Sequence, residues 1–135
     1  MARSRSSLGF LGRFGRSHDL QQLDAALRAV DLHPGVVPEA VKLTIVNLLK
    51  DHAIGDEPAP QIYRPTAELI AYCMIGASGV AASNPPEVIE QVERRIEKAL
   101  DAGDSLDAQL VLLTLHAKVI QPSVVERFGL RSDEG

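Results

Sequence analysis

The side chains that most often carry out chemistry are few in this sequence and lie far apart. The four histidines occur at separate places and Cys73 is the single cysteine, so no spacing typical of a zinc site is present. The phosphate-binding pattern GxxxxGK[ST], the nucleophile motif GxSxG and the zinc-protease motif HExxH are also absent from the sequence. The sequence therefore predicts no catalytic residue, no metal and no cofactor, and enzymatic activity is the less favoured interpretation.

One carboxylate stands apart from the other acidic residues. Glu68 is followed by an uncharged stretch, with Tyr72 one helical turn later and Arg64 one turn before it. The simpler interpretation is an acid near a helix N-terminus that pairs with Arg64. The alternative is that Glu68 and Tyr72 line a pocket together with His116, a lone imidazole at the end of a leucine-rich segment. Such a pocket would indicate a small-ligand binder or a minor enzyme.

The segment from Pro65 to Ser83 is expected to organise the fold. After Glu68 it carries no charged side chain, and the next one in the sequence is Glu87. A helix that is apolar on all sides belongs in a protein interior or a membrane, and the uncharged run is shorter than the ~20 residues that a bilayer requires. The pattern predicts the central helix of a bundle.

Small and polar residues form a possible contact stripe along this central segment. Tyr72, Gly76, Gly79 and Ser83 recur at spacings that place them on one side of a continuous helix. Each internal glycine costs about 1 kcal/mol relative to alanine, so some interaction must offset that cost. The simpler interpretation is a tight crossing with another helix of the chain, or a kink. The alternative is the floor of a ligand groove or a self-association surface.

The composition favours a single helical domain. The chain has 135 residues, of which 45% are hydrophobic and only 4% aromatic, with no tryptophan. An aliphatic core of this kind is typical of helices rather than of sheets. The lone Cys73 excludes an internal disulfide and fits a reducing compartment, so a cytoplasmic location is expected. In apolar surroundings its thiol is expected to be buried and inert.

Capping residues, prolines and glycines predict where the helices begin and end. The expected starts are Ser17 or Asp19, then Pro38, Pro65, Pro85, Asp104 and Pro122. In the fourth helix the apolar stripe runs to Leu100, whereas the fifth is apolar on almost every side up to Val119 and is expected to be deeply buried. A glycine at position 129 is expected to end the last, short helix.

Two all-α architectures are compatible with these helices. The first is a compact five- or six-helix bundle around the central apolar helix. The second is a short solenoid-like stack of three helix hairpins, because hairpins would start near residues 20, 65 and 105, a spacing within the range of helical repeats. The sequences of the three hairpins do not repeat well, so the bundle is the favoured prediction.

The N-terminal segment differs from the rest of the chain in charge. We expect a basic flexible arm at 1–18, a helical domain at 19–131 and a polar tail at 132–135. The arm holds four arginines and no acid, whereas the remainder holds ten basic and eighteen acidic residues. Phe10 and Phe14 could lie on the chain's own surface or on a neighbouring subunit. Contact with nucleic acid or membrane is less favoured, because four arginines provide only a modest, salt-screened attraction.

Together these features predict an interaction module rather than an enzyme. The favoured function is a protein-interaction or scaffold module that acts through a helical surface and associates with itself or with a protein partner. The residues expected to form that surface are Tyr72, Gly76, Gly79 and Ser83, together with Phe10 and Phe14 of the arm.

Overall fold

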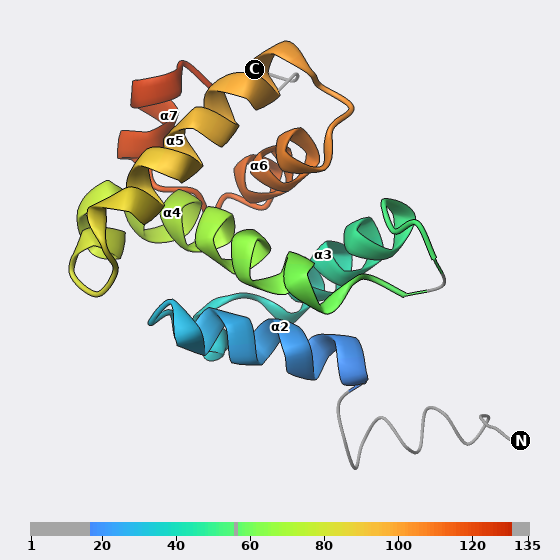
Figure 1. Cartoon of the computed structure of the whole chain (residues 1–135). Coiled ribbons are helices and arrows are strands. Elements are labelled where there is room, and N and C mark those ends of the chain that lie inside the picture. Colours follow the sequence, from blue (N-terminus) through green and yellow to red (C-terminus); the bar gives the residue numbers. More distant parts are fainter. Residues whose placement is uncertain (1–16, 56, 131–135) are drawn as a thin grey trace, which may run out of the picture.

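The computed structural model describes residues 17–55 and 57–130, and this part of the chain is built of α-helices (Figure 1). They are α2 (His18–Ala29), α3 (Glu39–Asp51), α4 (Tyr63–Ala81), α5 (Pro86–Asp101), α6 (Leu106–His116) and α7 (Pro122–Phe128), with 3₁₀ turns at Pro34–Val36 and Pro60–Ile62. The predicted all-α class is confirmed. Most of the predicted arm and all of the tail at 132–135 lie outside the described residues, and His18 already belongs to α2.

The helix starts follow the capping chemistry in the sequence. The hydroxyl of Ser17 accepts a hydrogen bond from the backbone N–H of Leu20 at 3.2 Å, and Ser105 accepts one from Ala108 at 3.1 Å. These side chains satisfy donors that the first helical turn cannot satisfy itself. The starts predicted at Pro65, Pro85 and Asp104 each differ by one or two residues from those observed, as is usual for boundaries set by caps.

Helix α4 occupies the middle of the bundle. In Figure 1 it crosses the molecule with α2 on one side and α5, α6 and α7 on the other, and it packs against all four of these helices. Helix α3 packs against α2 and also against α6. In a solenoid each hairpin would contact only the next one, but here the first hairpin reaches the third. The compact bundle around the central apolar helix is therefore correct, and the solenoid-like stack is wrong.

The predicted burial of the central segment holds for its first part. Tyr72 is 1% exposed, and no exposed surface is found for four of its close neighbours in α4: Leu69, Ile70, Ala71 and Cys73. Beyond Gly76 the helix is only partly covered, and Ser78 is exposed. The expectation that this segment is hidden on every side was wrong for its second part, because the helix changes direction at Gly76.

Gly76 breaks α4 and provides the docking point of α7. Its backbone angles are φ 77° and ψ 175°, a region that is essentially restricted to glycine. The carbonyl of Cys73, three residues before the break, accepts a hydrogen bond from the backbone N–H of Gln121 at 2.7 Å. A segment far away in the sequence thus adds a hydrogen bond to the central helix.

A buried ion pair joins the first two helices. The Nζ of Lys42 in α3 lies 3.2 Å from Oδ1 of Asp24 in α2, and both side chains are largely buried. Glu39 lies 3.6 Å from the same ammonium group. Burial of the two charges costs solvation energy, which their mutual attraction offsets only while both partners are present.

Substitution of Gly76 tests the role of the break. Gly76→Ala is expected to lower the free energy of unfolding by about 1–3 kcal/mol, because alanine is strained at this φ and ψ. Its Cβ would also lie 3.3 Å from Oγ of Ser123 in α7. The matched control is Gly103→Ala, where a Cβ meets no atom within 4 Å and stability should change little. Urea unfolding of the two variants measures the difference, and equal effects would contradict this explanation.

A double-mutant cycle tests the buried ion pair. Asp24→Leu alone is expected to cost about 3 kcal/mol of stability, because the ammonium of Lys42 loses its buried partner. The double substitution with Lys42→Met should cost less than Asp24→Leu alone, since it removes both charges from the interior. Chemical denaturation of the single and double variants measures the coupling. Strictly additive effects would show that the pair makes no net interaction.

Candidate functional site

The stripe predicted on α4 does not form one continuous face. Because the helix breaks at Gly76, Tyr72 and Gly79 lie on segments of different direction. Tyr72 and Gly76 are buried, and Ser123 of α7 lies close to Gly76. The sequence interpretation as a kink describes this stripe. The interpretation as an open groove or self-association surface does not, because the chain's own α7 covers its middle.

Gly79 and Ser83, the last two residues of the stripe, have their closest neighbours within the chain itself. A Cβ on Gly79 would come within 2.8 Å of Ile75 in the same helix, so this glycine accommodates its own turn rather than a second helix. The hydroxyl of Ser83 donates to the carboxylate of Asp31, which links the end of α4 to the end of α2. Phe10 and Phe14, the other residues predicted to form an interaction surface, lie outside the described residues.

The three residues of the predicted pocket have separate surroundings. Glu68 accepts a hydrogen bond from Nε of Arg64 at 3.2 Å, as in the simpler sequence interpretation. Tyr72 is buried and donates to Glu93 at 2.7 Å. His116 is exposed at the C-terminal end of α6. The structure therefore does not join these side chains into one hydrogen-bonded group.

The hydroxyl of Tyr72 belongs to a structural cluster that connects three helices. Glu93 of α5 accepts the Tyr72 hydrogen bond on one oxygen and pairs through the other with Nη2 of Arg127 in α7, at 3.1 Å. The guanidinium of Arg127 lies 5.6 Å from the ring centre of Phe128, which in turn contacts the Tyr72 ring edge-on. Burial and the adjacent Glu93 carboxylate raise the pKa of Tyr72 above its usual value. This cluster fixes α7 against α4 and α5.

A second polar cluster fixes α6. Arg95 of α5 forms a bidentate ion pair with Asp107, with N···O distances of 3.0 and 2.9 Å. Its third nitrogen, Nη1, donates a hydrogen bond to the backbone carbonyl of Pro65 in α4 at 2.9 Å. Because all three guanidinium nitrogens donate to groups of the chain itself, Arg95 has a structural role. These contacts leave no local signal in the sequence, because Pro65 and Asp107 are distant from Arg95 in the chain.

Asp19 connects the start of α2 to two other elements. Its Oδ1 accepts a hydrogen bond from the hydroxyl of Tyr63 at 2.9 Å, and its Oδ2 lies 3.3 Å from Nζ of Lys50. Desolvation and the neighbouring carboxylate raise the pKa of Tyr63 above its usual value. From the sequence, Asp19 was expected only at a helix start, because contacts with residues so distant in the chain leave no local signal.

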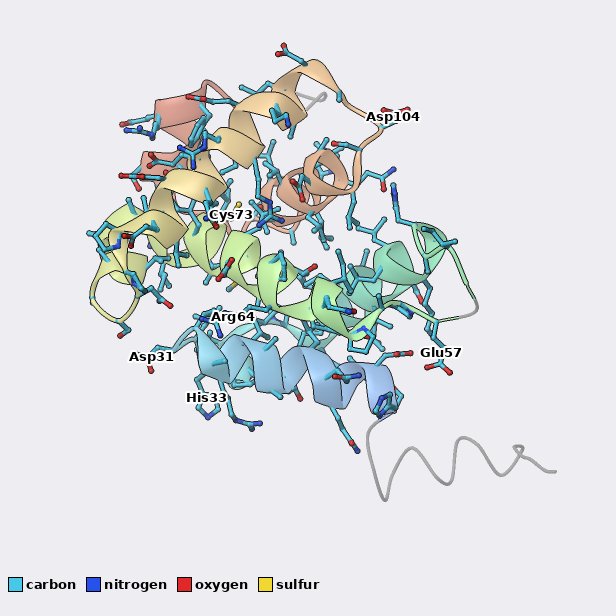
Figure 2. All side chains as sticks on the ribbon, viewed as in Figure 1. Asp31, His33, Glu57, Arg64, Cys73 and Asp104 are labelled. Atoms are coloured by element: carbon cyan, nitrogen blue, oxygen red, sulfur yellow. The ribbon has the colours of Figure 1, made fainter. Side chains whose placement is uncertain are left out.

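The histidines, acids and cysteine are dispersed over the fold. Figure 2 shows Cys73 in the interior, while Asp31, His33, Glu57 and Asp104 lie at separate places on the outside. Within residues 17–55 and 57–130, no three His, Cys, Asp or Glu side chains are grouped so that they could hold a metal ion. In the same part of the chain, no helix is both long enough and apolar enough to cross a membrane.

An apolar surface hollow between α5 and α6 is the strongest candidate for a binding site. It has a volume of about 260 Å³, and the residues that line it include Ile96, Leu100, Val111, Leu112, Leu115 and Leu130. We call it the α5–α6 hollow. Leu100 is 53% exposed and Leu112 is 40% exposed, so the expected deep burial of α6 was wrong on this side.

Comparison of the chain with models of protein families, with curated proteins and with solved structures gives no match. The function of the α5–α6 hollow must therefore be inferred from its own chemistry. Every wall residue named above is aliphatic, and none of the three polar clusters contributes a side chain to the wall. Such a surface can bind apolar side chains, but it offers no acid, base or nucleophile for catalysis.

The titration of Cys73 tests whether its surroundings are solvent-free. Burial raises the pKa of this thiol to about 12 from the ordinary value of 9.0, and opposing effects of Thr114 and Arg95 are smaller. Between these two pH values the unfolded chain releases the proton and the folded chain retains it. The free energy of unfolding should therefore fall as pH rises above 9, by up to about 1.4 kcal/mol per pH unit.

Urea unfolding at pH 8, 9 and 9.5 measures this dependence. Cys73→Ala should make the stability nearly independent of pH between 8 and 9.5, below the range in which the raised pKa values of Tyr63 and Tyr72 contribute. An unchanged slope in the variant, or rapid reaction of the native thiol with a disulfide reagent, would contradict burial of Cys73.

Proposed function

We propose that the protein is a self-associating interaction module and that a second copy of the chain binds at the α5–α6 hollow. The observation that carries this proposal is the hollow itself, with an aliphatic lining and two half-exposed leucines, Leu100 and Leu112, among its walls. Adjacent exposed leucines around one concavity are typical of a protein contact surface, whereas single exposed leucines are common on any protein.

The size of the hollow supports a protein partner over a small ligand. Pockets for small molecules usually have volumes of ~300–1,000 Å³ and contain a few polar groups that orient the ligand. The α5–α6 hollow is smaller, at about 260 Å³, and its side-chain lining is aliphatic. It can accept one or two large apolar side chains, which is how an interaction module recognises a partner.

Self-association is supported by the combination of features on this face. In a symmetric dimer each copy must supply both the surface that receives the partner and the group that the partner receives. The α5–α6 hollow is the receiving surface, and the exposed Leu100 and Leu112 add apolar contact area to its wall. The single buried cysteine fits a reducing compartment, so the cytoplasm is the proposed location.

Substitution of Leu112 tests this function. Leu112→Gln should weaken self-association about tenfold, because burial of the surface that this 40% exposed leucine still presents contributes about 0.6–1.2 kcal/mol and a symmetric dimer buries it twice. The matched control is Leu43→Gln on α3, where a leucine of similar exposure, 46% against 40%, lies away from the hollow. Sedimentation equilibrium of the wild type and both variants measures the dissociation constant.

The Leu43 control distinguishes a specific loss of association from a general effect of a leucine-to-glutamine substitution. Both substitutions place glutamine, a good helix former, at a half-exposed helix position, so neither should unfold the chain. A wild-type chain that remains monomeric at about 100 μM, or equal weakening by both substitutions, would contradict the proposal.

A further inference from the structure

We propose that the part of the second copy that enters the α5–α6 hollow is its N-terminal segment, residues 1–16. This inference rests on the proposed function and names the occupant of the same site. It is derived from the apolar side chains of the segment, from its charge and from the place where it joins the bundle.

The apolar residues of the segment match the chemistry of the hollow. Leu8, Phe10, Leu11 and Phe14 occur within seven consecutive positions, and the two phenylalanines are two of only three in the chain. A phenylalanine buries about 150–250 Å² when it enters an apolar site. A hollow of about 260 Å³ with leucine and isoleucine walls is suited to one or two side chains of this size.

The charges of the segment are opposite to those of exposed acidic residues that are close in sequence to the wall of the hollow. Arg3, Arg5, Arg13 and Arg16 are the only charged side chains among residues 1–16. Three exposed acidic residues are close in sequence to the wall residue Leu100. Glu97 lies three residues before it, Asp101 follows it directly, and Asp104 lies in the loop to α6. The basic side chains of α5 group elsewhere, around Arg94 and Lys98. Arginines beside the docked phenylalanines would therefore meet carboxylates.

The position of the segment favours a second copy over the same chain. Residue 17 caps α2, which lies on the opposite side of α4 from α5 and α6 (Figure 1). To reach its own hollow, the segment would have to cross from the α2 side of α4 to the side where α5 and α6 lie (Figure 1). Sixteen residues span up to ~55 Å when extended, which is sufficient to reach a neighbouring molecule. Reciprocal exchange between two copies would then close a symmetric dimer without further contacts.

A second hollow provides the internal comparison. It has a volume of about 240 Å³ and lies beside the end of α3, with Leu49, Ile54 and Ile62 among its lining residues. This hollow is closer to the start of α2, because Asp19 of α2 contacts Lys50 of α3. If simple proximity determined where the segment binds, this second hollow would be occupied. Its residues therefore serve as the reference in the test.

Paramagnetic labelling of the full-length chain locates the segment. A nitroxide label on Gly12→Cys attaches selectively, because Cys73 is fully buried. The nitroxide-labelled chain is not enriched in ¹⁵N. It is mixed with an equal amount of wild-type chain that carries no nitroxide and is enriched in ¹⁵N. The amide signals of Leu100, Leu112 and Leu115 should lose at least about half of their intensity, while those of Leu49 and Ile54 should remain. The loss in the mixed sample reports contact between two copies.

The dependence on the phenylalanines completes the test. Phe10→Ser with Phe14→Ser should restore these signals and weaken self-association at least about tenfold, the effect expected for loss of buried aromatic area. Ser6→Ala with Ser7→Ala, a matched change in the same segment, should alter neither. Loss of signal at Leu49 and Ile54 instead, or no loss of signal at any of these residues in the mixed sample, would overturn the inference.

The two proposals can fail separately. A dimer that depends on Leu112 but not on Phe10 and Phe14 would overturn the role of the segment and leave the proposed function intact. A dimer that is insensitive to Leu112→Gln and also to the double phenylalanine substitution would overturn both proposals. A chain that is monomeric throughout would overturn them as well.

Discussion

The enclosure of the first part of α4 determines the rest of the architecture. From Leu69 to Cys73 this helix presents no side chain to water, so it can exist in solution only when other helices surround it. Four helices do so, with α2 on one side and α5, α6 and α7 on the other. The remaining helix, α3, packs between α2 and α6. The arrangement follows from the need to cover one helix that has no polar face.

Polar side chains hold the covering helices in place. Asp19 connects α2 to α3 and α4, Arg95 connects α5 to α6 and α4, and Glu93 connects α5 to α4 and α7. Each cluster lies where helices meet, and in each the charged group has a partner of opposite charge. Tyr72, which the sequence placed in a possible pocket, thus connects two helices of the bundle through its hydrogen bond to Glu93. The α5–α6 hollow, in contrast, is lined by apolar side chains.

The sequence was sufficient to predict the features that depend on local interactions. Caps and prolines gave the helix starts within one or two residues, and Gly129 ends α7 in the left-handed conformation as expected. The hydrogen bond from Gln121 to the break at Gly76 could not be predicted, because its partners lie far apart in the chain. The exposure of Leu112 was missed because α6 is apolar on almost every side, so its pattern contains no polar face to mark the outward direction. Leu100 was assigned to an inner stripe for the corresponding reason: periodicity identifies an apolar face, but not where a neighbouring helix stops covering it.

The attachment of α7 has a consequence for how the fold opens. This helix has only seven residues, too few to be stable alone, and it is held at its start by the Gln121 hydrogen bond and along its length by the Glu93 cluster. Leu130, which follows it directly, forms part of the wall of the α5–α6 hollow. Local opening of the C-terminal turn would therefore remove one wall of the hollow and expose the Cys73 carbonyl in the same event. An occupant that contacts Leu130 would therefore be expected to slow exchange of the Gln121 amide with solvent.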